Sequence, residues 1–238
     1  MSYYGYPEYV SVSEKKEKAK KSLAKLKKSN PDISPVIIEG RSIANKWWGK
    51  AWNKNLESYA DYSNRIGRGR SYVRNGAVLD LKIKEGKVEA LVQGSSTKPY
   101  KVEITIDKLS KTKWKNVTEA CNNRIDTLET LLSGKFPKEF DEFFSNPKYG
   151  LFPSPKEIHF KCSCPDSARM CKHVAAALYG IGARLDEDPI LFFKLRDIDF
   201  QELLKKSMEE KMQSMLKNAD KKSERIIDDK DVFNLFGV

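Results

Sequence analysis

The sequence predicts an α+β fold in which a small antiparallel meander sheet is packed with helices and is followed by a ββα-like metal-binding module and C-terminal helices. Three runs in the first half of the chain alternate apolar and polar residues, which is the period of a half-buried strand. Helical periodicity flanks these runs on both sides. The 238 residues suffice for a buried core in one larger domain or two small ones.

The predicted strands are short and closely spaced. Their apolar residues are Leu79, Leu81 and Ile83, then Val88, Ala90 and Val92, then Val102, Ile104 and Ile106. Glycine-containing turns at 74–76 and 84–86 precede and follow the first run. Turns of this length connect antiparallel neighbours, so the runs are expected to form hairpins of a meander with one buried face.

The first helix is predicted at about residues 43–61, with Ser42 as its N-cap. It contains Trp47, Trp48 and Trp52. Tryptophan can stack on nucleic-acid bases, but aromatic residues at helical spacing more commonly pack in a core. We therefore assign these three side chains to packing.

Further helices are predicted in the second half of the chain. A helical stretch at about 114–132 places Cys121 in its apolar stripe, where a small buried hydrophobe is expected. Another helix is expected at about 172–184. A last helix has one apolar side made of Phe200, Leu203, Leu204, Met208, Met212 and Met215. This Met-rich side suits packing within the monomer or a groove on a partner.

Four regions follow from these patterns. Residues 1–35 are expected to form a basic, flexible N-terminal arm, and 36–135 an α+β domain with the antiparallel sheet. Residues 136–199 are expected to form the metal-binding finger, and 200–238 an amphipathic helical extension.

The charge of the chain indicates an anionic partner. Lysine and arginine number 44 against 33 acidic residues, giving a net charge of +11. Such a charge attracts polyanions, and nucleic acid is the commonest. No apolar run is long enough to span a membrane and no secretory signal is recognisable, so a cytoplasmic protein of the cytosol or nucleoid, without a membrane partner, is expected.

Two basic segments are candidate nucleic-acid contacts. The arm has eight lysines between residues 15 and 28, and residues 65–74 place four arginines on what is expected to be a glycine-containing loop. Arginine forks suit phosphate oxygens. The candidates are Lys20, Lys21, Lys27, Lys28, Arg65, Arg68, Arg70 and Arg74. A solvated tail, and arginines paired with acidic residues of the body, remain the alternatives.

The most specific motif is CSCPDSARMCKH, which supplies Cys162, Cys164, Cys171 and His173. Three thiolates and one imidazole complete a tetrahedral zinc site and leave no position for a reactive water. Residues two apart in an extended segment point to the same side, so Cys162 and Cys164 suit a strand end. Cys171 is expected to precede a helix and His173 to lie in its first turn. One structural Zn²⁺ is therefore predicted.

Other chemistry is not supported by the sequence. His159 is an alternative fourth ligand. Zinc deaminases need a Glu two residues after the ligand His, whereas Lys161 and Ala175 stand at that spacing here. The arginine segment lacks the third glycine of a dinucleotide-binding loop, and no P-loop or catalytic triad is recognisable. We expect a protein that is not an enzyme and has no small-molecule substrate.

The CxC and CxH pairs followed by an alanine-rich helix resemble the SWIM-type zinc finger. The segments IEGRSIANKWWGKAW, RIGRGRSYVRNG and VQGSSTKPYKVEI resemble bacterial SWIM-finger proteins, so the similarity extends over residues 36–200. The resemblance implies a ββα-like SWIM zinc finger. It also implies an accessory role beside Swi/Snf-type DNA-dependent ATPases, because members of this family are often encoded next to them.

These observations lead to two functional expectations. The first is a non-enzymatic zinc-finger protein that binds nucleic acid, DNA above all, and acts with a Swi/Snf-type ATPase. The alternative is a protein–protein adaptor in which the finger and the Met-rich helix dock a partner, while the charge serves solubility.

Overall fold

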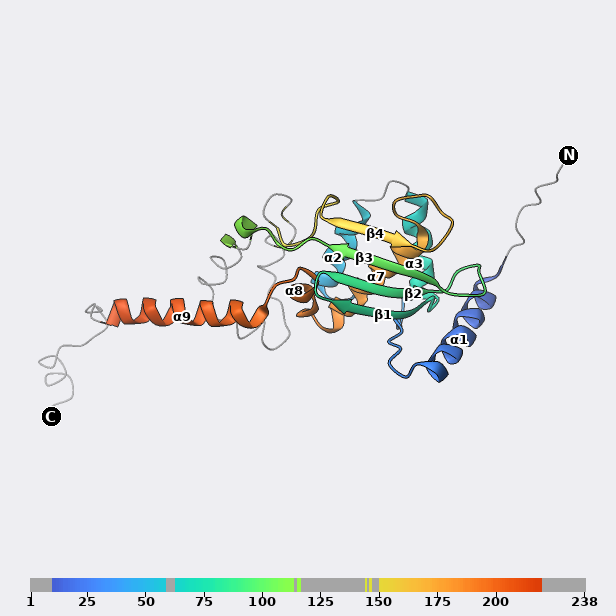
Figure 1. Ribbon diagram of the computed structural model, residues 1–238, viewed down its shortest axis with the longest axis horizontal. Helices are drawn as coiled ribbons and strands as arrows, with labels where there is room; N and C mark the ends of the chain where they lie inside the picture. Colours follow the sequence, from blue (N-terminus) through green and yellow to red (C-terminus); the bar gives the residue numbers. More distant parts are fainter. Residues whose placement is uncertain are drawn as a thin grey trace, which may run out of the picture.

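The computed structural model describes residues 10–58, 63–113, 115–116, 144, 146 and 150–219. Its strands are β1 (Val78–Lys84), β2 (Lys87–Val92), β3 (Tyr100–Ile106) and β4 (Ile158–Cys162). Its helices are α1 (Val12–Ser29), α2 (Trp47–Glu57), α3 (Ser63–Arg74), α7 (Lys172–Glu187), α8 (Leu191–Leu195) and α9 (Phe200–Ala219). Figure 1 shows the sheet with its neighbouring helices and α9 extending away from them.

The four strands form one antiparallel sheet in the order β1-β2-β3-β4, which confirms the predicted α+β class and meander. Gly86 lies in the two-residue turn between β1 and β2 with φ +62°, a left-handed conformation that favours glycine. β4 lies within the region predicted as a separate finger, yet it pairs with β3 along its length. The predicted boundary at 135/136 therefore separates strands of one sheet.

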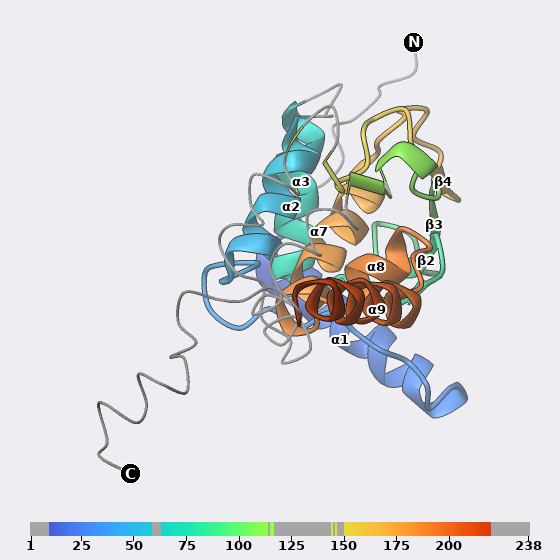
Figure 2. The same ribbon diagram turned by 90° about the vertical axis from the view of Figure 1, so that its left-hand side faces the viewer.

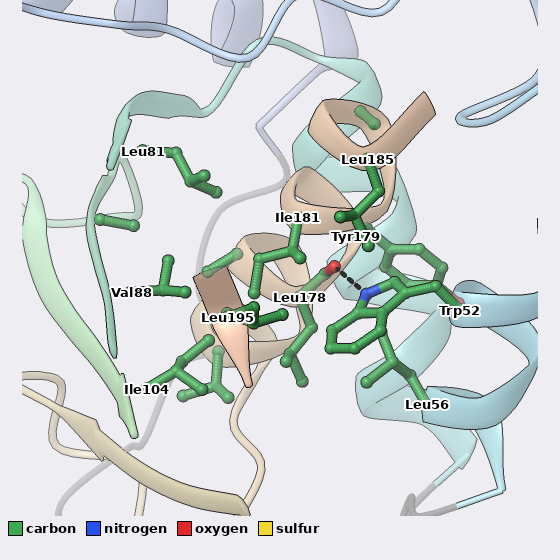
Figure 3. Close-up of a cluster of buried hydrophobic side chains, with 14 of the residues drawn as sticks. Trp52, Leu56, Leu81, Val88, Ile104, Leu178, Tyr179, Ile181, Leu185 and Leu195 are labelled. Atoms are coloured by element: carbon green, nitrogen blue, oxygen red, sulfur yellow. Dashed lines mark hydrogen bonds between the residues drawn. The ribbon is translucent and has the colours of Figure 1, made fainter. Parts of the chain in front are cut away.

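Helix α7 lies at the centre of the molecule. Twelve of its 16 residues are buried, because one face packs on the sheet and another contacts α2 and α3. Figure 2 shows this layering, with α7 between the sheet and the α2–α3 pair. In Figure 3, Leu81, Val88 and Ile104 of the sheet approach α7 from one side, while Trp52 of α2 approaches from the other.

The tryptophans of α2 pack in the core, as predicted. Trp48 and Trp52 are buried, and Trp47 is half-buried against the same cluster. The indole Nε1 of Trp52 donates to the carbonyl oxygen of Leu178 at 3.0 Å, which satisfies its one polar group inside the core.

Helix α2 begins at Trp47, so the predicted start at residue 43 and the predicted N-cap at Ser42 are wrong. The Ser42 hydroxyl instead donates to the carbonyl oxygen of Ala44 at 2.5 Å. The carboxylate of Asp186, at the end of α7, accepts from the backbone N–H groups of Asn45 and Lys46 at 2.8 and 2.7 Å. A long-range carboxylate thus binds the backbone N–H groups immediately before α2, and local sequence carries no signal of it.

The arginine-containing segment is a helix, α3, and not the predicted loop. Ile66, Gly69 and Val73 are buried on the side that meets α7. A Cβ at Gly69 would lie 2.4 Å from the Cβ of Ala175. Gly69 therefore permits close helix packing, and tertiary contact overrides its low helix propensity.

Residues 12–29, expected to be part of an arm, form helix α1. Ser11 and Glu14 form a capping box, with the Ser11 side chain accepting from the Glu14 N–H and the Glu14 carboxylate accepting from the Ser11 N–H. Ala19 is buried, and Lys18 Nζ donates to the Ser95 carbonyl oxygen at 2.7 Å. These contacts hold α1 against the end of the sheet beside the β2–β3 loop.

The C-terminal helix α9 extends away from the sheet and its covering helices (Figure 1). Met208, Met212, Met215 and Leu216 are 60–68% exposed, so these four side chains do not pack within the described part of the monomer. Helix α7 continues to Glu187, beyond the predicted end at 184. The helix predicted at 114–132 lies, with Cys121, almost entirely outside the described residues.

Candidate metal centre

The four predicted ligands come from three consecutive pieces of the chain. Cys162 is the last residue of β4, and Cys164 follows in the loop. Cys171 is the N-cap of α7, where its sulfur accepts from the Val174 N–H at 3.5 Å. His173 lies in the first turn of α7, as the sequence predicted.

The structure brings these four side chains together. Their ligand atoms all lie within 4.8 Å of one another. The Nδ1 atom of His173 is 4.0 Å from the sulfur of Cys162 and 3.9 Å from that of Cys171. In a tetrahedral zinc site with ordinary bond lengths, sulfur and nitrogen ligands are about 3.6 Å apart. The group could therefore hold one metal ion.

The ionisation states of the three thiols are linked to one another. A hydrogen bond from Cys162 lowers the pKa of Cys171 to about 3. The same hydrogen bond raises the pKa of Cys162, and burial raises the pKa of Cys164. Crowded thiols resist forming several thiolates, so a ligand set with three negative sulfurs requires a positive ion among them.

The second face of the histidine is enclosed by aromatic rings and backbone. His173 is 2% exposed, and the ring of Tyr100 lies 4.3 Å from the imidazole between centroids. Tyr72 of α3 contacts it edge-on at 5.5 Å. A Cβ at Gly94 would lie 2.6 Å from Nε2. These contacts hold the imidazole with Nδ1 toward the cysteines, as a metal ligand requires.

The Nε2 atom of His173 is buried and has no hydrogen-bond partner in the part of the chain that the structure describes. Gly94, Tyr100 and Tyr72 all belong to segments outside the CxC and CxH motif. Sequence reasoning did not assign them to the site. Only the glycine-containing segments 65–76 and 92–104 gave a signal, as parts of the family resemblance.

His159, the alternative ligand, lies outside the cluster. It is exposed on β4 and its Nε2 is 3.1 Å from the carboxylate of Asp107. Side chains alternate between the two faces of a strand, and His159 is three positions from Cys162. The two side chains therefore point to opposite faces of β4.

Two of the four candidate arginines are engaged within the protein. Arg65 Nη1 lies 2.5 Å from Asp166 in the loop between the two ligand pairs, and both side chains are largely buried. Arg70 is paired with Glu57, whose carboxylate also accepts from the Tyr179 hydroxyl at 2.7 Å. The pairing of Arg65 and Arg70 with acidic residues, which the sequence left open, is observed here.

The remaining candidates are solvent-exposed. Arg68 and Arg74 lie on the outer side of α3. Lys20, Lys21, Lys27 and Lys28 are exposed on α1, and none of them has an ion pair with another described residue. The predicted set is thus spread over two helices, and its exposed members are the four lysines of α1 together with Arg68 and Arg74 of α3.

The chain is similar to an uncharacterized protein of Mycobacterium tuberculosis, Rv2102, with 37% identity over 183 residues. The match covers 73% of this chain and 66% of that protein, so the chain spans just under two thirds of its relative. No family model matches the chain, and no solved structure matches it. Among the described helices, none is both long and apolar enough to cross a membrane.

Proposed function

We propose that this protein is a SWIM-type zinc-finger protein, without enzymatic activity, that binds nucleic acid as an accessory factor of a Swi/Snf-type ATPase. The observation that carries the zinc assignment is the convergence of three cysteine sulfurs and one histidine nitrogen within 4.8 Å. Thiolate and imidazole are the ligands that Zn²⁺ takes in closed structural sites. All four coordination positions are supplied by side chains, so the ion would stabilise the fold and leave no open position for a substrate.

The zinc ion would join three parts of the structure. It would connect the end of β4, the loop after it and the start of α7, which is the central helix of the core. Structural zinc contributes directly to folding free energy. Purified protein should contain one zinc per chain by elemental analysis, and Cys164→Ser and His173→Ala should lose it together with much of their cooperative unfolding. A metal-free native protein with unchanged stability would overturn the assignment.

Support for nucleic-acid binding comes from α1. Eight of its residues are lysine. Its two acidic residues, Glu14 and Glu17, lie in its N-terminal half. An exposed helix with many more cationic than acidic residues attracts phosphates and releases their counterions on binding. The exposed Arg68 and Arg74 add to the same charge on α3.

The test is a fluorescence anisotropy titration with labelled DNA and RNA at several salt concentrations. The logarithm of the affinity should fall linearly with the logarithm of salt, by nearly one power of ten per decade for each phosphate neutralised. The variant Lys20→Gln/Lys21→Gln/Lys27→Gln/Lys28→Gln should bind more weakly and with a shallower slope. A salt-independent signal, or equal binding by this variant, would contradict the proposal.

A protein adaptor is the second candidate, and the exposed side of α9 favours it. Met208, Met212, Met215 and Leu216 follow one another at helical spacing on one face. Flexible methionine side chains adapt to apolar grooves. Under this function a protein partner would be retained in a pull-down after nuclease treatment, and the variant Met208→Gln/Met212→Gln/Met215→Gln would not retain it. The purified protein would not bind nucleic acid.

A further inference from the structure

The outer face of the sheet, opposite α7, is not covered by a described helix (Figures 1 and 2). A groove of about 540 Å³ lies on it and crosses all four strands. Its lining residues are Asp80, Lys82, Glu89, Ala90, Leu91, Lys101, Val102, Glu103, Lys161, Cys162 and Ser163. The groove belongs to none of the sites described above, although its β4 side ends at the metal ligand Cys162.

Strand register gathers the charged residues into cross-strand rows. Lys82 pairs with Glu89, Glu89 with Glu103, and Glu103 with Lys161. The next row contains Asp80, Leu91 and Lys101. Side chains at paired positions lie on the same face, so the groove has lysines from β1, β3 and β4.

The acidic residues of the groove already have partners. Glu89 pairs with Lys84 at 2.6 Å and with Lys87 at 3.1 Å, and Glu103 pairs with Lys87 at 2.7 Å. The Asp80 carboxylate accepts from the Ser34 N–H at 2.8 Å. Two lysines outside the groove therefore pair with Glu89 and Glu103, and a backbone N–H binds Asp80.

The three lysines of the groove are left without such partners. Lys82, Lys101 and Lys161 form no ion pair with any residue that the structure describes. Lys101 and Lys161 are exposed and Lys82 is half-buried. Three cations converge on one groove whose floor is strand backbone and the half-buried Leu91.

We propose that this groove binds the phosphate backbone of single-stranded nucleic acid through Lys82, Lys101 and Lys161. The inference rests on the proposed nucleic-acid function and adds a second contact surface to α1. A single strand can lie along a charged groove of this kind and present its phosphates to the three lysines. Helix α1 lies beyond the sheet end at which β1 begins and β2 finishes, so a strand leaving the groove there meets its lysines (Figure 1).

The composition of the groove also argues against recognition of base sequence. None of its lining residues is aromatic, so bases cannot stack there on an aromatic platform. Ammonium groups contact phosphates irrespective of sequence. Binding is therefore expected to be nearly independent of base composition and strongly dependent on salt.

The experiment compares three matched triple variants of the full-length, metal-loaded chain. Lys82→Gln/Lys101→Gln/Lys161→Gln removes the groove cations, and Lys20→Gln/Lys21→Gln/Lys28→Gln removes those of α1. Lys50→Gln/Lys54→Gln/Lys156→Gln is the control, with the same loss of charge at exposed positions elsewhere. Each is titrated with labelled oligothymidylate, a mixed-sequence single strand and a duplex, all of about 20 nucleotides per strand.

The groove variant should bind either single strand roughly 10- to 100-fold more weakly at about 0.1 M salt, with a salt slope shallower by about 2, because a single strand releases about 0.7 counterion per phosphate contact. Its duplex binding should change no more than that of the control. If the groove variant matches the control while wild type and the α1 variant differ, the groove proposal is wrong and the proposed function stands. If wild-type protein binds none of the three probes, the proposed function itself is wrong.

Discussion

The two glycines of α3 provide a sharp test of the packing in this structure. A Cβ at Gly69 would lie 2.4 Å from the Cβ of Ala175, 2.9 Å from the Ala175 carbonyl carbon and 3.0 Å from the Ala176 nitrogen. Carbon atoms in contact are normally about 3.5–4.0 Å apart, so α3 and α7 would have to separate by about 1 Å. A Cβ at Gly67, in the same helix, would have nothing within 4 Å.

The two alanine substitutions should therefore have opposite signs. Gly67→Ala should stabilise the protein by about 0.5–1 kcal/mol, because alanine restricts the unfolded chain and favours helix. Gly69→Ala gains the same propensity term but overpacks a buried interface, for which about 1–3 kcal/mol is typical. Its net effect should be a destabilisation of about 1–2 kcal/mol.

Urea unfolding followed by circular dichroism measures both variants on one scale. The difference between them should be about 2–3 kcal/mol, and the slope of the transition should not change. If residues 65–74 formed a solvated loop, as the glycines suggest from sequence alone, the two substitutions would have similar and small effects. Equal free energies, or a stabilised Gly69→Ala, would refute the close packing of α3 on α7.

Three further measurements test separate parts of the structure. Burial alone would raise the pKa of Glu157, but hydrogen bonds from Arg196 and from the Ser154 N–H lower it to about 2. This carboxylate should contribute on the order of 2–3 kcal/mol to the free energy of unfolding above about pH 4.5, and that contribution should be lost as pH falls toward 2. Glu157→Gln should remove this part of the acid dependence. An unchanged profile of stability against pH would contradict the ion pair. Trp52→Phe should cost about 2–3 kcal/mol in urea unfolding, since it leaves a gap and removes the Nε1 hydrogen bond, and a loss below about 0.5 kcal/mol would argue against its burial. Gly94→Ala should weaken zinc binding about 10- to 100-fold in competition with a chromophoric chelator, because its methyl group would displace the imidazole of His173. Gly67→Ala is the control and should leave zinc binding unchanged.

Local patterns in the sequence were sufficient to predict an element whose structure depends on its own buried residues. Period-two runs located β1, β2 and β3, because a sheet with one buried face alternates its side chains. The spacing of CxC and CxH predicted Cys171 before a helix and His173 within it. Few backbone conformations allow ligands at that spacing to surround one tetrahedrally coordinated ion.

The predictions failed where a distant residue decides the structure. The start of α2 depends on Asp186, which accepts from the Asn45 and Lys46 N–H groups across 140 residues of sequence. The helical state of residues 63–74 depends on the surface of α7 that receives Gly69. Ile66 and Val73, seven residues apart, were the only local signal that this segment has a helical apolar side.

The position of the metal centre also bears on the proposed nucleic-acid surface. Cys162 closes β4 and lines the groove through its strand, while Cys171 and His173 begin the helix beneath the sheet. The segment from Ser163 to Met170 has Asp166 held by Arg65, and the ligand cluster joins the strand end to the start of α7. An ion at this point would set the separation of β4 from α7, and with it the position of Lys161 relative to Lys101. Zinc would then act on nucleic-acid binding through the shape of the groove, which is compatible with an ion that has no free coordination position and takes no part in chemistry.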